Sequence, residues 1–479
     1  MTSQRPLVGA SGAAASGGEQ PPAGRVSVLR ARARPLVADV APKLYSVPFL
    51  FVLGYLLVDF GRPHSWVPIL GYLRPGIWVL GGGMLCLVSN RAFKVPSGAR
   101  FMVAFFALMV MLVPFSANSR MAFNFTRDFG LMLFGALLPM MAFVDSYERL
   151  RTLMRFWVWI HVPLALYSIT HKGFGVGSFL TDENDFALAM NMVIPYALAL
   201  LLIETGTARR VCLMLATGIL VFGSTATMSR GGFVGLVSMG VVLWLRSTKK
   251  LVTLAVVLLM SGAVAALTPA AYWREVASIA DADQAGDTGY ERIYLWGIAW
   301  QMFQDNPVLG VGPGNFQYNN QNYEDPVRVA QGRHVWGQVA HSLYFTLLPE
   351  YGVVGTVLFA AMLFKTVVQR RRLLRAGRAL IKRPDALSEE EREHITTYMQ
   401  LAAAMDTSLV ALLTTGAFIA VLYYPHVWLL TTYTVVVCSL AERDFTAYEA
   451  KIKATAPPEP RRLIQRLRPA WQTRSRLST

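Results

Sequence analysis

The sequence predicts an all-α polytopic membrane protein. Of its 479 residues, 54% are hydrophobic and only 15% are charged, whereas soluble domains carry about 25% charged residues. Several apolar segments reach the roughly 20 residues that a helix needs to cross a bilayer. The formal net charge of +16 would suggest nucleic-acid binding in a soluble protein. Here the positions of the basic residues indicate a lipid bilayer as the partner and no nucleic acid.

Hydropathy and segment length predict about 12 transmembrane helices. Their approximate ranges are 44–60, 67–89, 101–117, 128–144, 154–170, 186–204, 211–227, 231–246, 251–268, 342–364, 400–422 and 427–441. The first nine therefore fall within residues 44–268 and the last three within 342–441. A cytoplasmic helix is predicted at 365–399, between the tenth and eleventh spans.

The remaining segments are polar. Residues 1–43 lack the apolar core of a signal peptide and are expected to form a disordered, basic cytoplasmic tail. Residues 442–479 form a second basic tail. Residues 269–341 form one large outer loop, rich in aromatic and polar side chains. Cys86, Cys212 and Cys438 each fall within a predicted span, and their spacing indicates neither a disulfide framework nor a metal site.

The distribution of basic residues sets the orientation. With the N-terminus in the cytoplasm, 35 of the 45 lysines and arginines lie in cytoplasmic segments, as the positive-inside rule requires. The same distribution explains the net charge, because basic segments at the inner surface face anionic lipid headgroups. Any arginine on the outer side is therefore unusual.

Arg230 is the first such residue, within STATMSRGGFVGL. The small residues before it and the two glycines after it allow a bend and close approach of neighbouring segments. A charged side chain at membrane depth is costly and by default suggests a functional site. The alternative is an arginine that reaches to lipid headgroups.

Arg292 is the second, within GYERIYLWGIAWQMFQDNPVLGVGPGNF. Tyr290, Ile293, Trp296, Gly297 and Trp300 give an apolar face at helical spacing, which we expect to lie along the membrane with Arg292 beside it. A solvated arginine on an amphipathic helix is an equally good interpretation. The helix should end at Asn306 and Pro307. The glycine-rich turn that follows either cradles phosphate or is a compact loop with positive φ angles.

His341 and Glu350 form a third unusual feature, in AHSLYFTLLPEYGVVG. An unperturbed imidazole can accept a proton at neutral pH, although a lone histidine is also a common helix-start residue. Glu350 lies roughly 13 Å from His341 along a straight helix, and Pro349 is expected to kink that helix. We therefore interpret Glu350 as a buried, substrate-site partner for Arg230 or Arg292.

Together these residues suit glycosyl transfer from a lipid diphosphate. Two guanidiniums can grip a diphosphate through bidentate bonds and stabilise its charge as it departs. A neutral histidine can take the proton of an attacking hydroxyl. No metal or other cofactor is required. Asp281 and Asp283 form a DxD-like pair, for which a solvated acidic loop is the more common meaning.

The order of four motifs resembles the O-antigen ligase and O-antigen polymerase superfamily. The motifs are LTDENDFALAM, STATMSRGGF, ERIYLWGIAWQMFQDNPVLGVGPGNF and AHSLYFTLLPEYGVVG, over about residues 180–360. The ligases carry a histidine, a small polar residue, nine variable positions and a glycine, which His341, Ser342 and Gly352 match. The family often has leucine four places after the second arginine, where this chain has Trp296.

The resemblance implies a metal-independent glycosyltransferase with a C-type membrane-embedded fold. Its donor would be a glycan on undecaprenyl diphosphate, and its site would face the periplasm from the bacterial inner membrane. Arg230 and Arg292 match arginines that are implicated in diphosphate binding, and His341 matches the proposed base. The acceptor is lipid A core in a ligase, another lipid-linked glycan in an O-antigen or exopolysaccharide polymerase, or a protein hydroxyl.

A transporter or flippase of lipid-linked glycans is the alternative from another functional class. It would use the arginines to bind diphosphate without chemistry. Transporters tend to contain paired interrupted spans in two halves of the chain, which this sequence lacks. The histidine-to-glycine spacing favours the ligase-like interpretation.

Overall fold

The fold is known from a computed structural model. It describes residues 44–177, 180–267, 288–383 and 386–455, together with Trp273 and Ala277. Contacts along the chain divide it after Lys43, and the described residues belong to the unit that begins at Leu44. The regular structure of this described part is helical, with no strand. The predicted all-α class is thereby confirmed.

Most helices correspond to the predicted apolar segments. In chain order they are α1 (Val47–Leu56), α2 (Pro63–Trp66), α3 (Ile69–Tyr72), α4 (Pro75–Ser89), α5 (Arg100–Leu112), α6 (Ser119–Met132), α7 (Leu138–Phe143), α8 (Tyr147–Thr170), α9 (Glu183–Ile203), α10 (Thr207–Ala226), α11 (Arg230–Arg246), α12 (Lys250–Leu267), α14 (Thr288–Asp305), α15 (Phe316–Asn319), α16 (Pro326–Ala330), α17 (Leu343–Ile381), α18 (Glu389–Thr415) and α19 (Pro425–Thr455). Short π-helical segments extend α1 (Leu57–Gly61) and join α6 to α7 (Leu133–Leu137), and 3₁₀ turns lie at Val113–Phe115, Asn320–Tyr323 and Gly416–Phe418.

Each predicted span overlaps a helix, but the number of membrane crossings stays a prediction. By length and composition, five helices of the described chain qualify as spans on their own. They are Ser119–Phe143, Glu183–Ile203, Thr207–Ala226, Leu343–Ile381 and Glu389–Phe418. The fold is thus that of a multi-pass membrane protein built from apolar helices.

Several predicted segments differ from the structure, and two of them are interrupted. The span expected at 67–89 is continuous only from Pro75, because the residues between Pro68 and Pro75 form only the short helix α3. The single helix expected at 365–399 is instead divided between the end of α17 and the start of α18. Ser388 begins α18 with a capping box, in which its side chain and that of Glu391 satisfy each other's backbone amides.

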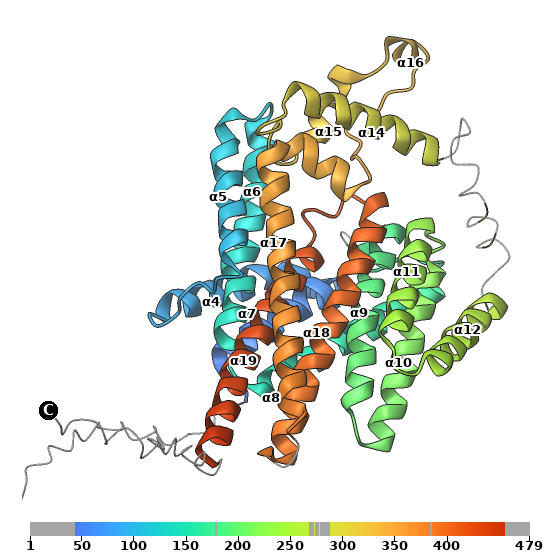
Figure 1. The fold of residues 1–479 in the computed structure, drawn as a ribbon. Helices are drawn as coiled ribbons and strands as arrows, with labels where there is room; N and C mark the ends of the chain where they lie inside the picture. Colours follow the sequence, from blue (N-terminus) through green and yellow to red (C-terminus); the bar gives the residue numbers. More distant parts are fainter. Residues whose placement is uncertain are drawn as a thin grey trace, which may run out of the picture. The chain divides into compact units, whose positions relative to one another are not determined.

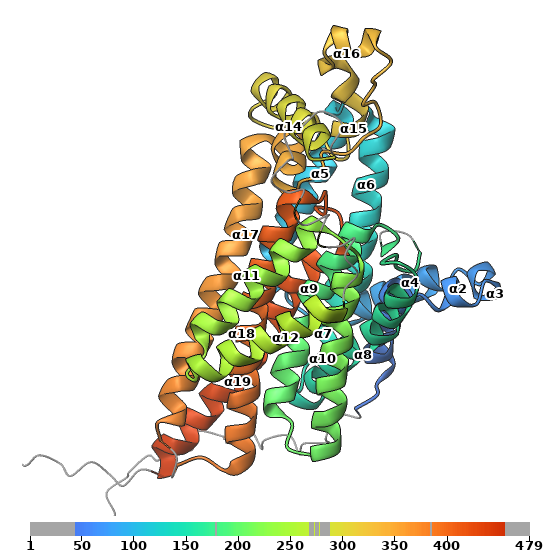
Figure 2. The same cartoon turned by 90° about the vertical axis from the view of Figure 1, so that its right-hand side faces the viewer.

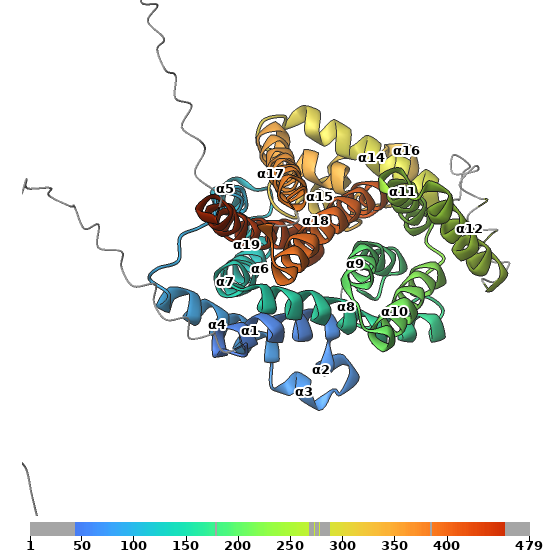
Figure 3. The ribbon, with the colours of Figure 1, turned by 60° about the horizontal axis from the view of Figure 1, so that its bottom comes forward.

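The long helices pack side by side around one large apolar core. Figure 3 shows α17, α18 and α19 next to one another, with α9 against α18 and α10 against both α9 and α8. A smaller, separate core joins α14 to the segments that follow it, through Leu295, Ile298, Ala299, Met302, Val311, Phe316, Val335 and Ala340. In Figures 1 and 2, α14, α15 and α16 cover one end of the long helices, where α17, α9 and α11 begin. The loops from α9 to α10 and from α17 to α18 lie at the other end.

A break in α17 shapes this covered end. Gly352 has φ 58° and ψ −158° inside the helix, a conformation that is essentially restricted to glycine. The carbonyls of Pro349 and Glu350 accept hydrogen bonds from the amides of Val311 and Gly312, at 2.8 and 3.0 Å. Within a bilayer such groups must be satisfied by the protein itself. The expected kink is therefore present, but it lies at Gly352 and not at Pro349.

The backbone amides on the C-terminal side of the break also have hydrogen-bond partners. The amides of Val353 and Val354 donate to the carbonyls of Pro307 and Val308, at 2.8 and 3.2 Å. The turn after α14, which begins at Pro307 as predicted, is thereby fastened to α17 on both sides of the break. This explains why the histidine-to-glycine spacing of the motif ends on a glycine.

We predict that Gly352→Ala lowers the midpoint of thermal unfolding. An added Cβ would lie 2.4 Å from the carbonyl of Val308, and the strained backbone alone costs about 1–3 kcal/mol. Gly297→Ala in α14 is the matched control, because its Cβ would meet no atom within 4 Å and a helix favours alanine over glycine by roughly 1 kcal/mol. Tryptophan fluorescence of the purified protein reports both midpoints. Equal midpoints for the two variants would contradict this account of the break.

Candidate functional site

Arg230, Arg292 and His341 line one cavity at the covered end. Its volume is about 330 Å³. We call it the arginine cavity, and its lining residues are Asp182, Glu183, Asn184, Met228, Ser229, Arg230, Glu291, Arg292, Leu295, Gln338 and His341. These three residues come from different elements, and more than 100 residues of chain separate Arg230 from His341. The folded chain thus brings together the groups that the sequence analysis combined into one site.

Arg230 is positioned by the start of α11. It is the first residue of that helix, and the Ser229 hydroxyl caps it by accepting a hydrogen bond from the Gly232 amide at 2.9 Å. The same hydroxyl donates to the side-chain oxygen of Asn184 at 2.8 Å. Met228, just before the cap, has φ 54°, which is uncommon for a residue with a side chain. The tight turn between α10 and α11 therefore aims the start of α11 into the cavity.

The two glycines after Arg230 allow close packing, as predicted. A Cβ at Gly232 would lie 2.5 Å from the Cβ of Ala187 on α9, so α9 and α11 approach within a distance that only glycine permits. The side-chain amide of Asn191 then donates to the Gly232 carbonyl at 2.9 Å. Both glycines are buried within α11. Gly232 allows the approach of α9, whereas a Cβ at Gly231 would meet the side chain of Phe418.

Arg292 is positioned by α14, one face of which packs into the small core. Leu295, Ile298 and Met302 are buried in the small core, whereas Ile293 and Trp300 are about half exposed. The apolar face predicted to lie along the membrane is therefore the exposed one. Glu291, next to Arg292, pairs with Arg328 at 2.6 Å.

His341 has an unusual backbone that two contacts support. Its φ is 46°, in the left-handed region that costs energy for a residue with a side chain. The Trp296 indole N–H donates to the carbonyl of Ala340, the preceding residue, at 2.9 Å. Ser342, the following residue, caps α17 by accepting from the Phe345 amide at 3.4 Å. Trp296, which stands where the family often has leucine, thus helps to fix the position of His341.

The pKa of His341 is lowered from the ordinary value of 6.5. Burial is the main cause, because it disfavours the charged imidazolium, and the positive charge of Arg292 acts in the same direction. The negative charge of Asp182 opposes both effects. At neutral pH the imidazole is therefore uncharged and able to accept a proton.

Glu350 does not have the partner that the sequence suggested. Its buried carboxylate accepts hydrogen bonds from the amides of Gly314 and Phe316, at 2.9 and 3.3 Å, and from the Tyr423 hydroxyl. In the described part of the chain, neither Arg230 nor Arg292 pairs with it. The predicted arginine partner is wrong because the glycine-rich turn folds back over α17 and presents its amides to the carboxylate first.

The same contacts settle the interpretation of the glycine-rich turn. Gly310, Gly312 and Gly314 have φ angles of 70°, 98° and 66°. The amides from Val311 to Gly312 and from Gly314 to Phe316 donate to protein oxygens. The turn is thus a compact loop with positive φ angles that holds α17, and its amides are not arranged around a phosphate.

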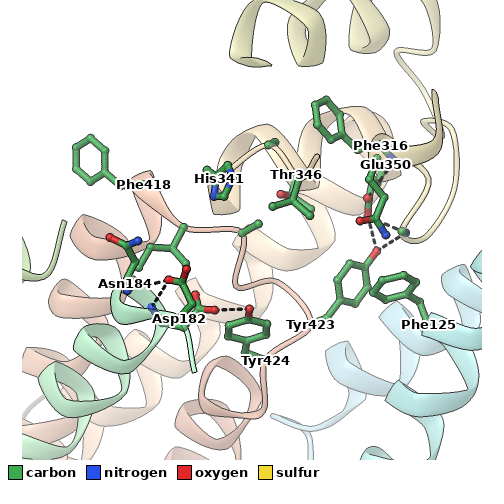
Figure 4. A pocket seen from close by; sticks show the side chains of 17 residues that line it. Phe125, Asp182, Asn184, Phe316, His341, Thr346, Glu350, Phe418, Tyr423 and Tyr424 are labelled. Atoms are coloured by element: carbon green, nitrogen blue, oxygen red, sulfur yellow. Dashed lines mark hydrogen bonds between the residues drawn. The ribbon is translucent and has the colours of Figure 1, made fainter. Parts of the chain in front are cut away.

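A second cavity, of about 390 Å³, adjoins the first. We call it the aromatic cavity, and it is lined by Phe125, Asp182, Asn184, Asp185, Gly314, Phe316, Gln317, Val339, Ala340, His341, Thr346, Glu350, Phe418, Ile419, Ala420, Tyr423 and Tyr424. His341, Asp182 and Asn184 line both cavities. In Figure 4, His341 and Thr346 lie between Asp182 and Asn184 on one side and Glu350 and Phe316 on the other. Glu350 therefore lines the aromatic cavity and not the arginine cavity.

Several lining residues were not predicted from the sequence. Asp182 caps α9 by accepting from the amides of Asn184 and Asp185, at 2.8 and 3.3 Å, and Tyr424 donates its hydroxyl proton to Asp185. The acidic residues lie in the motif LTDENDFALAM, in which several carboxylates precede an apolar helix, and this pattern could have indicated a functional site. Tyr424 lies in a short connection, where no sequence pattern indicates such a role. Asp281 and Asp283 lie outside the described residues.

The comparison with protein families agrees with the resemblance. Residues 215–360 match the family model described as O-antigen ligase, and the predicted resemblance to the O-antigen ligase and polymerase superfamily is confirmed. The match runs from α10 into α17 and includes Arg230, Arg292, His341 and Glu350. No curated protein matches the chain. The match and the apolar helices support a multi-pass membrane protein that acts as a glycan transferase in general.

We predict that the reactivity of His341 depends on pH with a midpoint below 6.5. Diethyl pyrocarbonate modifies only the neutral imidazole, so its rate should fall as the pH drops through the lowered pKa. Arg292→Gln removes a positive charge that lowers this pKa, and the midpoint should move upward. Peptide mapping by mass spectrometry isolates the modification of His341 from that of other histidines.

Arg333→Gln is the control for this titration. Arg333 is exposed and lines neither cavity, so its removal should leave the midpoint unchanged. A midpoint at or above 6.5 in the wild-type protein would contradict the lowered pKa of His341. An equal shift in both variants would contradict the effect assigned to Arg292.

Proposed function

We propose that the protein transfers a glycan from undecaprenyl diphosphate to an acceptor hydroxyl at the periplasmic face of the bacterial inner membrane. The observation that carries this proposal is the arginine cavity, in which two guanidiniums and a neutral imidazole share one space of about 330 Å³. The family match over residues 215–360 supports the same reaction class.

The two arginines hold the donor in this proposal. A diphosphate carries several oxygens in the geometry that guanidinium N–H groups fit. The cavity also contains carboxylates, and each guanidinium has five N–H donors, enough to contact a carboxylate and a phosphate oxygen together. The positive charges stabilise the charge that develops as the diphosphate departs.

His341 acts as the general base. Its neutral ring nitrogen takes the proton of the acceptor hydroxyl while the hydroxyl oxygen bonds to the anomeric carbon of the donor sugar. The bond between that carbon and the diphosphate oxygen breaks, and the diphosphate leaves with the electron pair. The guanidiniums supply the charge stabilisation, so that no metal takes part.

A ligase and a polymerase would share this chemistry and differ in the acceptor. The spacing from His341 through Ser342 to Gly352 favours a ligase-like enzyme, with lipid A core as the acceptor. A polymerase would use another lipid-linked glycan, and a protein hydroxyl is the third acceptor class. A lipid-linked glycan transporter would have no use for the neutral imidazole beside the arginines.

We predict that His341→Ala and His341→Gln strongly slow transfer but retain donor binding. General-base catalysis contributes about 10²–10⁴-fold, so kcat should fall by that factor. Donor and acceptor lipids are extracted from a host strain that lacks the protein, and transfer by the purified protein in lipid nanodiscs is followed as initial rates. Binding of radiolabelled undecaprenyl diphosphate is measured in parallel.

Arg230→Gln and Arg292→Gln should weaken that binding instead. Each charge-assisted hydrogen bond contributes about 1.5–3 kcal/mol, which is equivalent to roughly 10- to 150-fold in affinity, and Arg333→Gln should bind normally. Full transfer by His341→Ala would eliminate the base assignment. Movement of the donor lipid across the membrane without any transfer would instead favour the transporter.

A further inference from the structure

The aromatic cavity differs from the arginine cavity in charge. Among its lining residues there is no lysine or arginine, and its carboxylates come from Asp182, Asp185 and Glu350. Anionic groups such as phosphate are therefore disfavoured in this space. The arginine cavity is also lined by carboxylates, from Asp182, Glu183 and Glu291, but its two guanidiniums can bind phosphate oxygens. A phosphate group would thus be favoured beside the guanidiniums and disfavoured in the aromatic cavity.

The polar groups of the aromatic cavity can accept hydrogen bonds from a ligand. Each carboxylate has about four lone-pair sites, and the described contacts use only some of them: Asp185 accepts from the Tyr424 hydroxyl, and Asp182 accepts from two backbone amides. A ligand rich in hydroxyl donors would use the remaining sites. Gln317 adds both a donor and an acceptor to the wall.

Aromatic rings make up much of the rest of the wall. Phe125, Phe316, Phe418, Tyr423 and Tyr424 all line the cavity. Aromatic rings provide flat apolar surface, against which the C–H faces of a sugar ring can pack while its hydroxyls reach the carboxylates. The volume of about 390 Å³ lies within the usual range of about 300–1,000 Å³ for small-ligand sites.

The tyrosine hydroxyls hold this wall in place. Tyr423 donates to Glu350 on α17 and accepts from the Gly314 amide at 2.8 Å, and Tyr424 donates to Asp185 on α9. The connection between α18 and α19 is therefore tied to two other helices. These hydrogen bonds hold the two tyrosines in position in the wall.

We propose that the aromatic cavity binds the neutral sugar residue of the acceptor that carries the attacking hydroxyl. This assignment rests on the proposed function, and it adds the chemical class and place of the acceptor. His341 lines both cavities, so a hydroxyl held in the aromatic cavity can meet the same imidazole that adjoins the proposed diphosphate site.

Two cavity-filling substitutions test the assignment. Val339 and Ala420 both line the aromatic cavity and not the arginine cavity. Val339→Trp and Ala420→Trp should each lower kcat/KM for the acceptor by about tenfold or more, with undecaprenyl diphosphate affinity within about twofold of wild type. The donor and acceptor lipids are those extracted from a host strain that lacks the protein. Retained donor affinity also shows that the variants are folded.

Matched controls come from α16. Val329 has the same exposed fraction as Val339, 36%, and Val329→Trp and Ala330→Trp make the same chemical changes outside both cavities. Both controls should behave as wild type. Unchanged kcat/KM for the acceptor in Val339→Trp and Ala420→Trp would overturn the assignment of the acceptor to the aromatic cavity. An equal loss of acceptor kcat/KM and donor affinity would do the same. Either result would leave the proposed function standing. A wild-type protein that transfers no glycan would overturn the proposed function and the assignment with it.

Discussion

The contact between the Glu350 carboxylate and the glycine-rich turn is the interaction on which the covered end depends. It joins α17 to the amides of Gly314 and Phe316 and to the Tyr423 hydroxyl. Without the carboxylate, the buried Phe316 amide would be left without its partner, at about 1–3 kcal/mol. The Gly314 amide and the Tyr423 hydroxyl would keep only their contacts with Tyr423 and Tyr351. The turn connects directly to α14, and Tyr423 precedes Tyr424 and α19. One side chain thereby fixes the elements that carry Arg292 and the wall of the aromatic cavity.

Backbone strain is concentrated at the same end. Met228 and His341 both have left-handed φ angles, a conformation that costs on the order of 1–3 kcal/mol for such residues. Each is followed by a serine that caps the next helix. The helix caps and the indole of Trp296 maintain the two conformations. Residues that adjoin a sharp turn at a helix start are held more rigidly than residues on a free loop, which suits groups that must meet a substrate in one geometry.

The sequence predicted the helices and the proximity of Arg230, Arg292 and His341 better than it predicted the surroundings of these residues. Hydropathy finds apolar helices because their burial in lipid depends on composition, and arginines on the outer side are conspicuous against the positive-inside pattern. The partner of Glu350 was missed because helical spacing describes one helix and carries no information on a loop that folds back from 36 residues away. The break at Gly352 was missed for a related reason. A proline in a helical segment predicts a kink from sequence alone, whereas the φ angle of a glycine is known only from the folded structure.

The two cavities match the charges that a glycan transfer would generate. The proposed donor is an anion, and its leaving group gains charge during the reaction, whereas the proposed acceptor is a neutral sugar. A single cationic space would hold both the donor and the departing diphosphate well, but it would offer the acceptor hydroxyl little orientation. A single acidic space would repel the donor. In the arginine cavity two guanidiniums accompany the carboxylates, whereas the aromatic cavity combines carboxylates with aromatic rings and has no lysine or arginine in its lining. Each proposed substrate thus meets complementary groups, and His341, the proposed base, lines both spaces.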